Sequence, residues 1–590
     1  MSADARDRVA AADARDRAGA RGRRGRKPAR GMRRLARALR RLVSMIVVAA
    51  IAAACSAPGR DAESSGPDAG PTRRAGGAVV YGAEQEPAIL NPLLVEGGLL
   101  ATASVVVPVL WPLWRIRPDF TYEPLLLDGE PEVSVDPFAV TYRLRDEAVW
   151  SDGVPITAHD VLFTIETKLD ERFDINSVAG FDLIDLDATE VIDDKTIKVV
   201  FSEPFAPWRA LFSTADGVIL PRHALEGEDF NTIWNDGIVG ADGEPIASGP
   251  FKLASWTRGQ QLVLERNEAF WGEPAGLDQL VVRFMADSDT QVQALRGGEV
   301  DVLYPLPQPD LMDSLGGLDG VTLEVDHGPV WEHLDFNLVI PGLDQLAVRQ
   351  AIAQAIDREA IAAQLIAPLA GGQADPLHSV IYVANQSEYE PHFDRWRFDP
   401  DGAVRALEEA GCAKADDGIF VCDGVRLSFA YAATSGNQLR ELQFEVIQAQ
   451  LADIGIEVTP ALGEPAEVYG SVLPAGPDGA WDLFVYAYSG SPDPFENNTL
   501  YRCGGEQNFT SYCDEEVTRL LDETEREPDA AERVRLYNEV DSLIAEDLPL
   551  LPLYQIPQPM AFRSDLSGPQ NNTTQWGPLW NLEEWELTRE

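Results

Sequence analysis

The sequence contains few of the residues from which metal centres and nucleophilic sites are built. Only five Cys and six His occur among 590 residues. The histidines are scattered, and there is no H-E-x-x-H zinc motif, no G-x-S-x-G nucleophile elbow and no P-loop. Carboxylate pairs are frequent because the chain is acidic, so no particular pair indicates glycoside hydrolysis. We therefore expect a protein that is not an enzyme, does not hydrolyse ATP and uses no cofactor.

Basic residues are scarce outside the N-terminus. The first 54 residues hold 15 of the 48 Lys and Arg and only four Asp, so the remainder carries 33 basic and 92 acidic residues, a net charge of −59. Such a surface repels phosphates, which argues against a nucleic-acid partner. It is compatible with cationic or zwitterionic ligands. A surface charged only for solubility is the alternative explanation.

Long hydrophobic runs are also missing, apart from Leu42 to Ala54, which follows a group of arginines. This run has the length of a signal-peptide core and is too short to span a bilayer. Residues 51–55, Ile-Ala-Ala-Ala-Cys, resemble a lipobox with Ala52 in place of the preferred Leu, which implies that Cys55 is lipidated. We predict a lipoprotein signal peptide at 1–54. A plain secreted protein is the alternative, and either Met1 or Met32 could be the start.

The residues after the predicted signal, 55–76, are rich in Gly, Pro, Ser and Ala and are expected to form a flexible tether. The four remaining cysteines form two close pairs, Cys412 with Cys422 and Cys503 with Cys513. An even count in an exported chain favours disulfides, and of the three possible connectivities we expect the one with two local disulfides. A zinc site is the alternative, although C-x2-C spacing is absent.

The most informative stretch is Thr141 to Lys168, TYRLRDEAVWSDGVPITAHDVLFTIETK. Its first five residues alternate like a half-buried strand, and Ser-Asp-Gly at 151–153 is typical of a turn. Thr157 stands three residues before Asp160, the spacing of a capping box, and apolar residues then follow at helical spacing. The stretch therefore predicts a strand, a turn and a capped helix. Residues 187–201 are predicted to form an antiparallel hairpin.

The last third of the chain alternates between predicted strands and helices. Residues 427–431 and 456–460 are expected to be strands that flank an amphipathic helix at 441–454, the pattern of a βαβ unit in a parallel sheet. Residues 481–488, WDLFVYAY, form a nearly continuous apolar run, which indicates a strand buried on both faces.

The whole string at 141–168 resembles the signature of the family 5 extracellular solute-binding proteins, the peptide-binding components of ABC importers. Three further segments match the family in the same order: SGPFKLASWTRGQQLVLERNEAFWG at 248–272, TQVQALRGGEVD at 290–301 and LDFNLVIPGLDQLAVRQAIAQAIDREAI at 334–361. The resemblance extends over residues 77–590.

This resemblance implies an α/β, two-lobed, periplasmic-binding-protein-like fold of class II, with an extra subdomain inserted in lobe I. The domains that it implies are lobe I at 77–330 with the inserted subdomain at about 105–240, lobe II at 331–553, and a C-terminal return to lobe I at 554–590. The chain is expected to cross between lobes near 327–334 and 549–557.

By the same resemblance, the ligand lies near the end of the strand at 481–488. The predicted ligand-binding residues are Glu86, Trp331, Tyr486, Tyr488, Ser489, Gly490 and Asp493. The best-known peptide binders of the family have an aspartate, which neutralises the α-amino group of the peptide, at the position of Gly490. Asp493 or Glu86 could replace that charge, or the ligand could be a solute other than a peptide. For each aromatic residue, core packing is the alternative role.

The function implied by the resemblance is capture of peptides for an ABC permease by a monomer that is anchored through its lipid to the outer face of the cell membrane. Two alternatives remain open: the same fold could bind a non-peptide solute, or it could report a ligand to a signalling partner.

Overall fold

A computed structural model describes residues 76–464 and 467–588. The predicted signal peptide at 1–54, Cys55 and the tether up to residue 75 lie outside the described residues. No helix in the described part is both long and apolar enough to cross a membrane.

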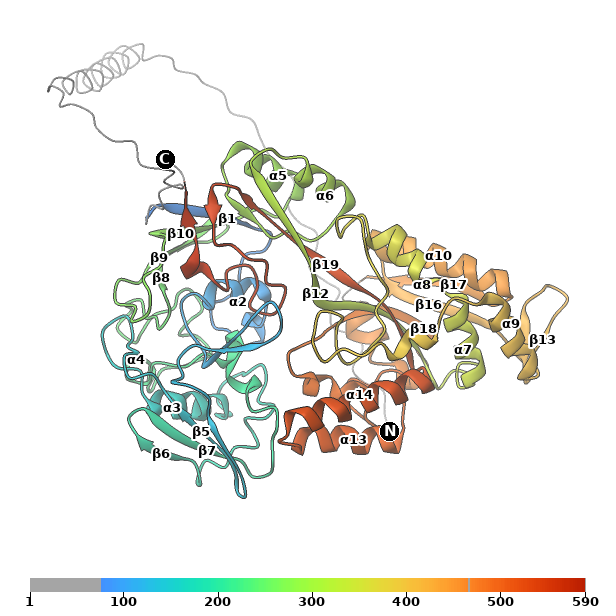
Figure 1. The fold of residues 1–590 in the computed structure, drawn as a ribbon, viewed down its shortest axis with the longest axis horizontal. Coiled ribbons are helices and arrows are strands. Elements are labelled where there is room, and N and C mark those ends of the chain that lie inside the picture. Colours follow the sequence, from blue (N-terminus) through green and yellow to red (C-terminus); the bar gives the residue numbers. More distant parts are fainter. Residues whose placement is uncertain (1–75, 465–466, 589–590) are drawn as a thin grey trace, which may run out of the picture. The chain divides into compact units, whose positions relative to one another are not determined.

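A mixed sheet of ten strands runs through the centre of the described chain (Figure 1). In spatial order its strands are β17 (Glu457–Gly463), β16 (Ser428–Thr434), β18 (Leu483–Ser489), β12 (Val321–Phe336), β19 (Leu550–Arg563), β11 (Val302–Leu303), β1 (Ala78–Ala83), β10 (Gln279–Phe284), β9 (Gln261–Arg266) and β8 (Phe251–Thr257).

Strands β12 and β19 are the longest in this sheet, and they pair antiparallel along most of their length. On its other edge β19 pairs with β11, and on its other edge β12 pairs with β18. The register between them is interrupted between His327 and Trp331. This irregularity lies in the predicted crossing segment 327–334, where the regular pairing of β12 and β19 is interrupted.

Two large hydrophobic clusters flank this irregularity. The first contains residues from 79 to 302 together with residues from 560 to 585, and the second contains residues from 331 to 554 together with Phe120 and Met312. We call the parts of the chain built around these clusters lobe I and lobe II. A chain of this length that forms two cores separates into two lobes, as the family resemblance implies.

A separate antiparallel sheet lies within the predicted inserted subdomain and consists, in order, of β4 (Glu132–Val135), β5 (Phe138–Arg143), β7 (Thr196–Val200) and β6 (Glu190–Asp193). The predicted hairpin at 187–201 is confirmed as β6 and β7. Helix α3 (Ala158–Lys168) packs beside it and begins with the predicted capping box, in which the Thr157 amide donates to the Asp160 carboxylate at 2.7 Å. Local polar residues thus fix where α3 begins.

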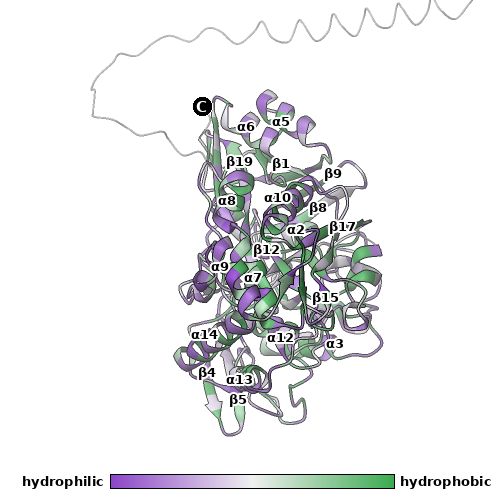
Figure 2. Cartoon of the chain, turned by 90° about the vertical axis from the view of Figure 1, so that its right-hand side faces the viewer, coloured by the Kyte–Doolittle hydropathy of each residue, from purple (hydrophilic) through white to green (hydrophobic). Residues whose placement is uncertain are grey.

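The remaining helices cover both lobes. In lobe I they are α2 (Leu100–Val106), α4 (Arg222–Leu225), α5 (Ser288–Gly297) and α6 (Pro309–Gly316). In lobe II they are α7 (Leu346–Ala355), α8 (Arg358–Ile361), α9 (Pro400–Glu409), α10 (Gln438–Ile454), α12 (Asn498–Tyr501), α13 (Glu515–Arg526) and α14 (Ala530–Asp547). Figure 2 shows α13 and α14 as largely hydrophilic, in keeping with helices at the surface.

Short strands complete the structure: β2 (Trp114–Ile116) with β3 (Tyr122–Pro124), β13 (Ala413–Lys414) with β14 (Phe420–Cys422) and β15 (Val425–Arg426), and β20 (Leu566–Ser567) with β21 (Glu586–Leu587). The predicted βαβ unit is confirmed, because β16 and β17 pair in parallel and α10 connects them. The predicted buried strand is β18, whose residues Leu483 to Tyr486 are all buried.

Candidate functional site

Three of the predicted ligand residues lie together on neighbouring strands. Trp331 on β12 is paired with Tyr488 on β18, and His333 is paired with Tyr486. Because side chains alternate along a strand, Trp331, His333, Tyr486 and Tyr488 share one face of the sheet. We call these four residues, with Asp335 of the same face, the aromatic cluster.

The rings of the aromatic cluster are in close contact. The His333 imidazole stacks on Tyr488, with centroids 4.4 Å apart and planes at 15°, and meets the ring of Tyr486 edge-on at 4.3 Å. Trp331 lies 5.0 Å from His333 and 5.8 Å from Tyr488. Trp331 is 2% exposed and Tyr486 4%, whereas Tyr488 is half-buried. Tyr488 is therefore the ring of this cluster that solvent, or a ligand, can reach.

Polar groups run through the same cluster. His333 Nδ1 lies 2.7 Å from a carboxylate oxygen of Asp335, and both residues are buried. The Tyr486 and Tyr488 hydroxyls form a hydrogen bond with each other. Burial, together with the nearby Asp335 carboxylate, raises the pKa of both tyrosines, so they remain protonated donors. His333 Nε2 has no hydrogen-bond partner among the described residues.

His333 and Asp335 were not among the predicted site residues. The signal was present, because both follow Trp331 at intervals of two within a strand, and such residues share a face. Glu332, between Trp331 and His333, faces the other way and forms an ion pair with Arg440 of α10 in which both side chains are buried. This pair ties β12 to the helix that covers the opposite face.

The loop after β18 contains Ser489, Gly490 and Asp493. Ser489 is exposed at the strand end. The Gly490 amide donates to the Pro329 carbonyl at 2.9 Å, and a Cβ at this position would lie 3.3 Å from Val383 Cγ1. A larger side chain at Gly490 would therefore have to displace the neighbouring segment slightly.

Asp493 is held by Arg533 of α14. Both carboxylate oxygens accept from the guanidinium at 2.5 Å, and the two side chains are 11% and 13% exposed. Asp493 also caps the short 3₁₀ helix η8 (Pro494–Asn497) by accepting from the Phe495 amide. The structure thus gives Asp493 an internal partner for its charge. Its assignment to the ligand stays a prediction.

Glu86 lies at the other end of the ten-stranded sheet. Its carboxylate accepts from Trp256 Nε1 at 3.0 Å and from the Gly259 amide at 2.9 Å, in the turn between β8 and β9. In the sheet order, β8 is the edge strand opposite to β17, whereas β12 and β18 belong to the other half. Glu86 therefore lies at the opposite half of the sheet from the aromatic cluster.

Both predicted disulfides are confirmed. Cys412 pairs with Cys422, and Cys503 pairs with Cys513. Because all four thiols are bonded in pairs, the zinc alternative is excluded for them. The described residues also contain no group of three or more His, Cys, Asp or Glu side chains that could hold a metal ion.

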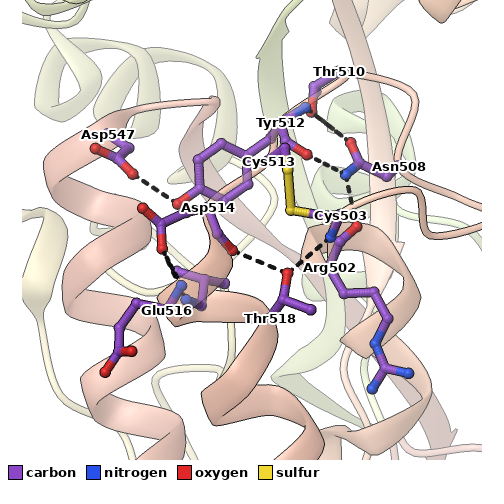
Figure 3. Close-up of a disulfide and its surroundings, with 11 residues drawn as sticks. Arg502, Cys503, Asn508, Thr510, Tyr512, Cys513, Asp514, Glu516, Thr518 and Asp547 are labelled. Atoms are coloured by element: carbon purple, nitrogen blue, oxygen red, sulfur yellow. Dashed lines mark hydrogen bonds between the residues drawn. A yellow bond between two sulfur atoms is a disulfide. The ribbon is translucent and has the colours of Figure 1, made fainter.

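The Cys503–Cys513 disulfide closes a loop that internal hydrogen bonds also hold together (Figure 3). The Asn508 amide group donates to the Arg502 and Tyr512 carbonyls, and the Tyr512 hydroxyl donates to Asp547 at 2.8 Å. The Thr510 carbonyl accepts from the Leu338 amide just beyond β12. The loop is thereby fixed to the strand that carries Trp331 and His333.

A pocket of about 570 Å³ lies elsewhere in lobe II, and none of the predicted ligand residues lines it. Its polar lining residues are Glu359, Asp375, His378 and Tyr389. His378 Nδ1 accepts from buried Arg358 at 3.3 Å, and burial together with that cation lowers the pKa of His378. Both effects favour the neutral imidazole, with its proton on Nε2 because Arg358 can only donate.

Comparison with known proteins identifies the family. The family model described as bacterial extracellular solute-binding proteins, family 5, matches residues 121–510. The oligopeptide-binding protein OppA of Mycobacterium tuberculosis is 28% identical over 561 residues, which cover 89% of this chain and 90% of OppA.

Solved structures share the fold. The periplasmic EDTA-binding protein EppA has a TM-score of 0.77 at 26% identity, covering 88% of this chain and 98% of EppA. The oligopeptide-binding protein AppA of Bacillus subtilis, in complex with a nonapeptide, has a TM-score of 0.67 at 23% identity, covering 88% of this chain and all of AppA. Because the family match spans well over half of its residues, this chain belongs to the bacterial extracellular solute-binding proteins of family 5.

Proposed function

We propose that the protein is the extracytoplasmic solute-binding subunit of an ABC importer and that it binds peptides between its two lobes. The observation that carries this proposal is the aromatic cluster, which lies at the end of β18 beside the segment shared by both lobes. Tyr488 offers a half-buried ring and a hydroxyl group, a combination suited to an apolar side chain and a polar group of one ligand.

The two-lobed fold supplies the mechanism of capture. A ligand that touches both lobes favours the arrangement in which they are closed, by the difference between its affinities for the closed and open states. The closed protein then delivers the ligand to the permease. We propose a monomer, because a two-lobed chain encloses its ligand without a second copy.

A non-peptide solute is the second candidate. Gly490 carries no charge and the Asp493 carboxylate is neutralised by Arg533, so neither offers a free anion to the amino terminus of a peptide. EppA, which is named for binding EDTA, shows that a related fold takes a very different ligand. A sensor for a signalling partner would use the same site.

A thermal-shift screen of di- to pentapeptides, preceded by native mass spectrometry of protein purified from its host, tests the proposal. Peptide binding raises the melting temperature in a saturable manner. The Tyr488→Ala variant should bind the same peptide at least about tenfold more weakly, because it loses a ring contact and a hydrogen bond. Phe398→Ala, which removes an exposed ring of lobe II, is the matched control and should bind normally. If only a co-purified compound that is not a peptide stabilises the protein, the second candidate is favoured.

The lipid anchor is a further part of the proposal and rests on the lipobox-like residues 51–55. A diacylglyceryl group on Cys55, which carries two acyl chains, would hold the protein at the outer face of the membrane. Cys55→Ser should move the protein from the membrane fraction to the soluble fraction. Unchanged membrane association in this variant would refute lipidation at Cys55.

A further inference from the structure

The two lobes touch at a second place, away from the strands that they share. Residues 203–206, which follow β7 in the inserted subdomain, lie against η8 and the end of α13 in lobe II. The Ala206 amide donates to the Glu525 carbonyl at 2.8 Å. The rings of Phe205 and Phe495 meet edge to face, with centroids 5.6 Å apart. Arg526 lies 3.6 Å from Glu203 at the exposed rim.

The ring contact continues into the subdomain. Phe205 stacks on Phe201, which in turn meets Phe138 of β5, at centroid distances of 5.8 and 5.6 Å. Phe205 is 4% exposed, and the half-buried Phe495 of lobe II packs against the hydrophobic cluster of lobe I. An aromatic side chain of one lobe is thus part of the apolar packing of the other.

The lobe II side of this contact is held in position by ion pairs. Asp493, next to the turn that carries Phe495, is bound by Arg533. The Glu525 carboxylate accepts from Asn498 at 2.8 Å and from Arg502 at 2.7 Å. Phe495 and the Glu525 carbonyl are therefore presented by a prearranged surface rather than by an unsupported loop.

A second crossing residue is Phe120, at the turn between β2 and β3. Its φ of 63° is left-handed, a conformation that bulky side chains avoid. Its side chain is only 6% exposed and belongs to the hydrophobic cluster of lobe II, whereas its neighbours Asp119 and Thr121 are exposed. Such a strained residue persists where its surroundings hold it in place.

We propose that Phe205 and Ala206 on one lobe, with Phe495 and Glu525 on the other, form an interlobe latch that favours the closed state before any ligand binds. One ring pair and one backbone hydrogen bond shift a two-state equilibrium by roughly 5- to 150-fold, enough to bias closure but not to lock it. Only its consequence for ligand release rests on the proposed function: the latch must open before the ligand leaves.

Hydrogen–deuterium exchange of the ligand-free, full-length chain tests the latch without any ligand. In Phe495→Ala, the segment 201–212 should exchange at least about fivefold faster than in the unsubstituted protein, because the Ala206 amide loses its partner whenever the lobes part. Phe398→Ala, the matched loss of an exposed ring, should leave this segment unchanged. Amides of β18, which lie in the core, report global unfolding and should be unaffected in both variants.

A charge substitution keeps the test decisive if Phe495→Ala does not fold. Glu203→Arg places two cations together at the exposed rim, and segment 201–212 should again exchange faster, by about two- to fivefold. The double variant Glu203→Arg with Arg526→Glu restores opposite charges and should return exchange to its original rate. Unchanged exchange in Phe495→Ala, or in Glu203→Arg where only that variant folds, would overturn the latch.

Ligand kinetics separate the latch from the proposed function. If a peptide from the screen binds, Phe495→Ala should release it about 3- to 30-fold faster, since the closed state is less populated. If no peptide binds but the exchange result holds, the peptide proposal falls and the latch stands. If peptides bind and leave at the same rate from both proteins, the role of the latch in release is wrong.

Discussion

At the scale of single residues, Asp541 in α14 is a strongly perturbed acid of lobe II. It is fully buried, and one of its oxygens accepts from the Val380 amide at 2.8 Å. The other has no partner among the described side chains and backbone groups. Burial raises the pKa of Asp541 from 3.8 to about 8. The segment that it supports, 379–383, borders Gly490 through Val383.

This perturbation predicts a pH dependence of stability. The folded state keeps the Asp541 proton up to about pH 8, whereas the unfolded chain releases it near pH 3.8. The contribution of Asp541 to the free energy of unfolding therefore falls as the pH rises between these values, by up to about 1.4 kcal/mol per pH unit, and is constant above pH 8.

Asp541→Asn keeps an acceptor for the Val380 amide and removes the titration. Urea unfolding at pH 5, 6, 7 and 8 should give a flatter profile for this variant than for the unsubstituted protein, and greater stability at pH 8. Glu539→Gln, an exposed position on the same helix, is the control and should leave the slope unchanged. Parallel profiles for Asp541→Asn and the unsubstituted protein would contradict this interpretation.

At the scale of elements, the Asp493–Arg533 ion pair joins the loop after β18 to α14. Asp493→Ala leaves the Arg533 cation buried without a partner, which should lower the free energy of unfolding by about 3–5 kcal/mol. The double variant Asp493→Ala with Arg533→Met removes both charges and should recover much of that loss. Chemical denaturation of the two variants measures the difference.

The same double variant decides whether Asp493 also serves the ligand. If the role of Asp493 is structural, the double variant should bind ligand within about threefold of the unsubstituted protein once its stability is restored. A tenfold or greater loss of affinity despite recovered stability would instead assign Asp493 to the ligand, as the sequence comparison suggested.

At the scale of the whole molecule, the two lobes are joined by two unbroken strands and not by a loose linker. β19 contributes residues to both hydrophobic clusters, β12 runs beside it and contributes to the second, and the pairing of the two strands is irregular only near its middle. A bend at that irregularity can open or close the lobes while most of the sheet stays paired. The latch lies away from this point, so small changes in its contacts act on the arrangement of the lobes as a whole.

Local patterns in the sequence were sufficient wherever the physics is local. The capping box at Thr157 and Asp160, the hairpin at 187–201, the βαβ unit around α10 and the ten-residue spacing within each cysteine pair all correspond to the structure. Each depends on residues close together in the chain, where side-chain period and turn chemistry leave few alternatives. The family motifs likewise predicted the fold class, which the structure confirms.

Contacts between distant segments were decided only by the tertiary structure. Arg533 lies 40 residues from Asp493, and nothing in the sequence marks it as that residue's partner among 92 acidic and 33 basic residues beyond the signal. The pairing of β12 with β18 buried His333 and Asp335 beside Trp331, and the fold brought Phe205 to Phe495. The sequence alone determined the elements and the family, because those depend on period and local order. The way in which the sheet and the loops close in space decides which charges are neutralised, which ring stays accessible and where the lobes meet.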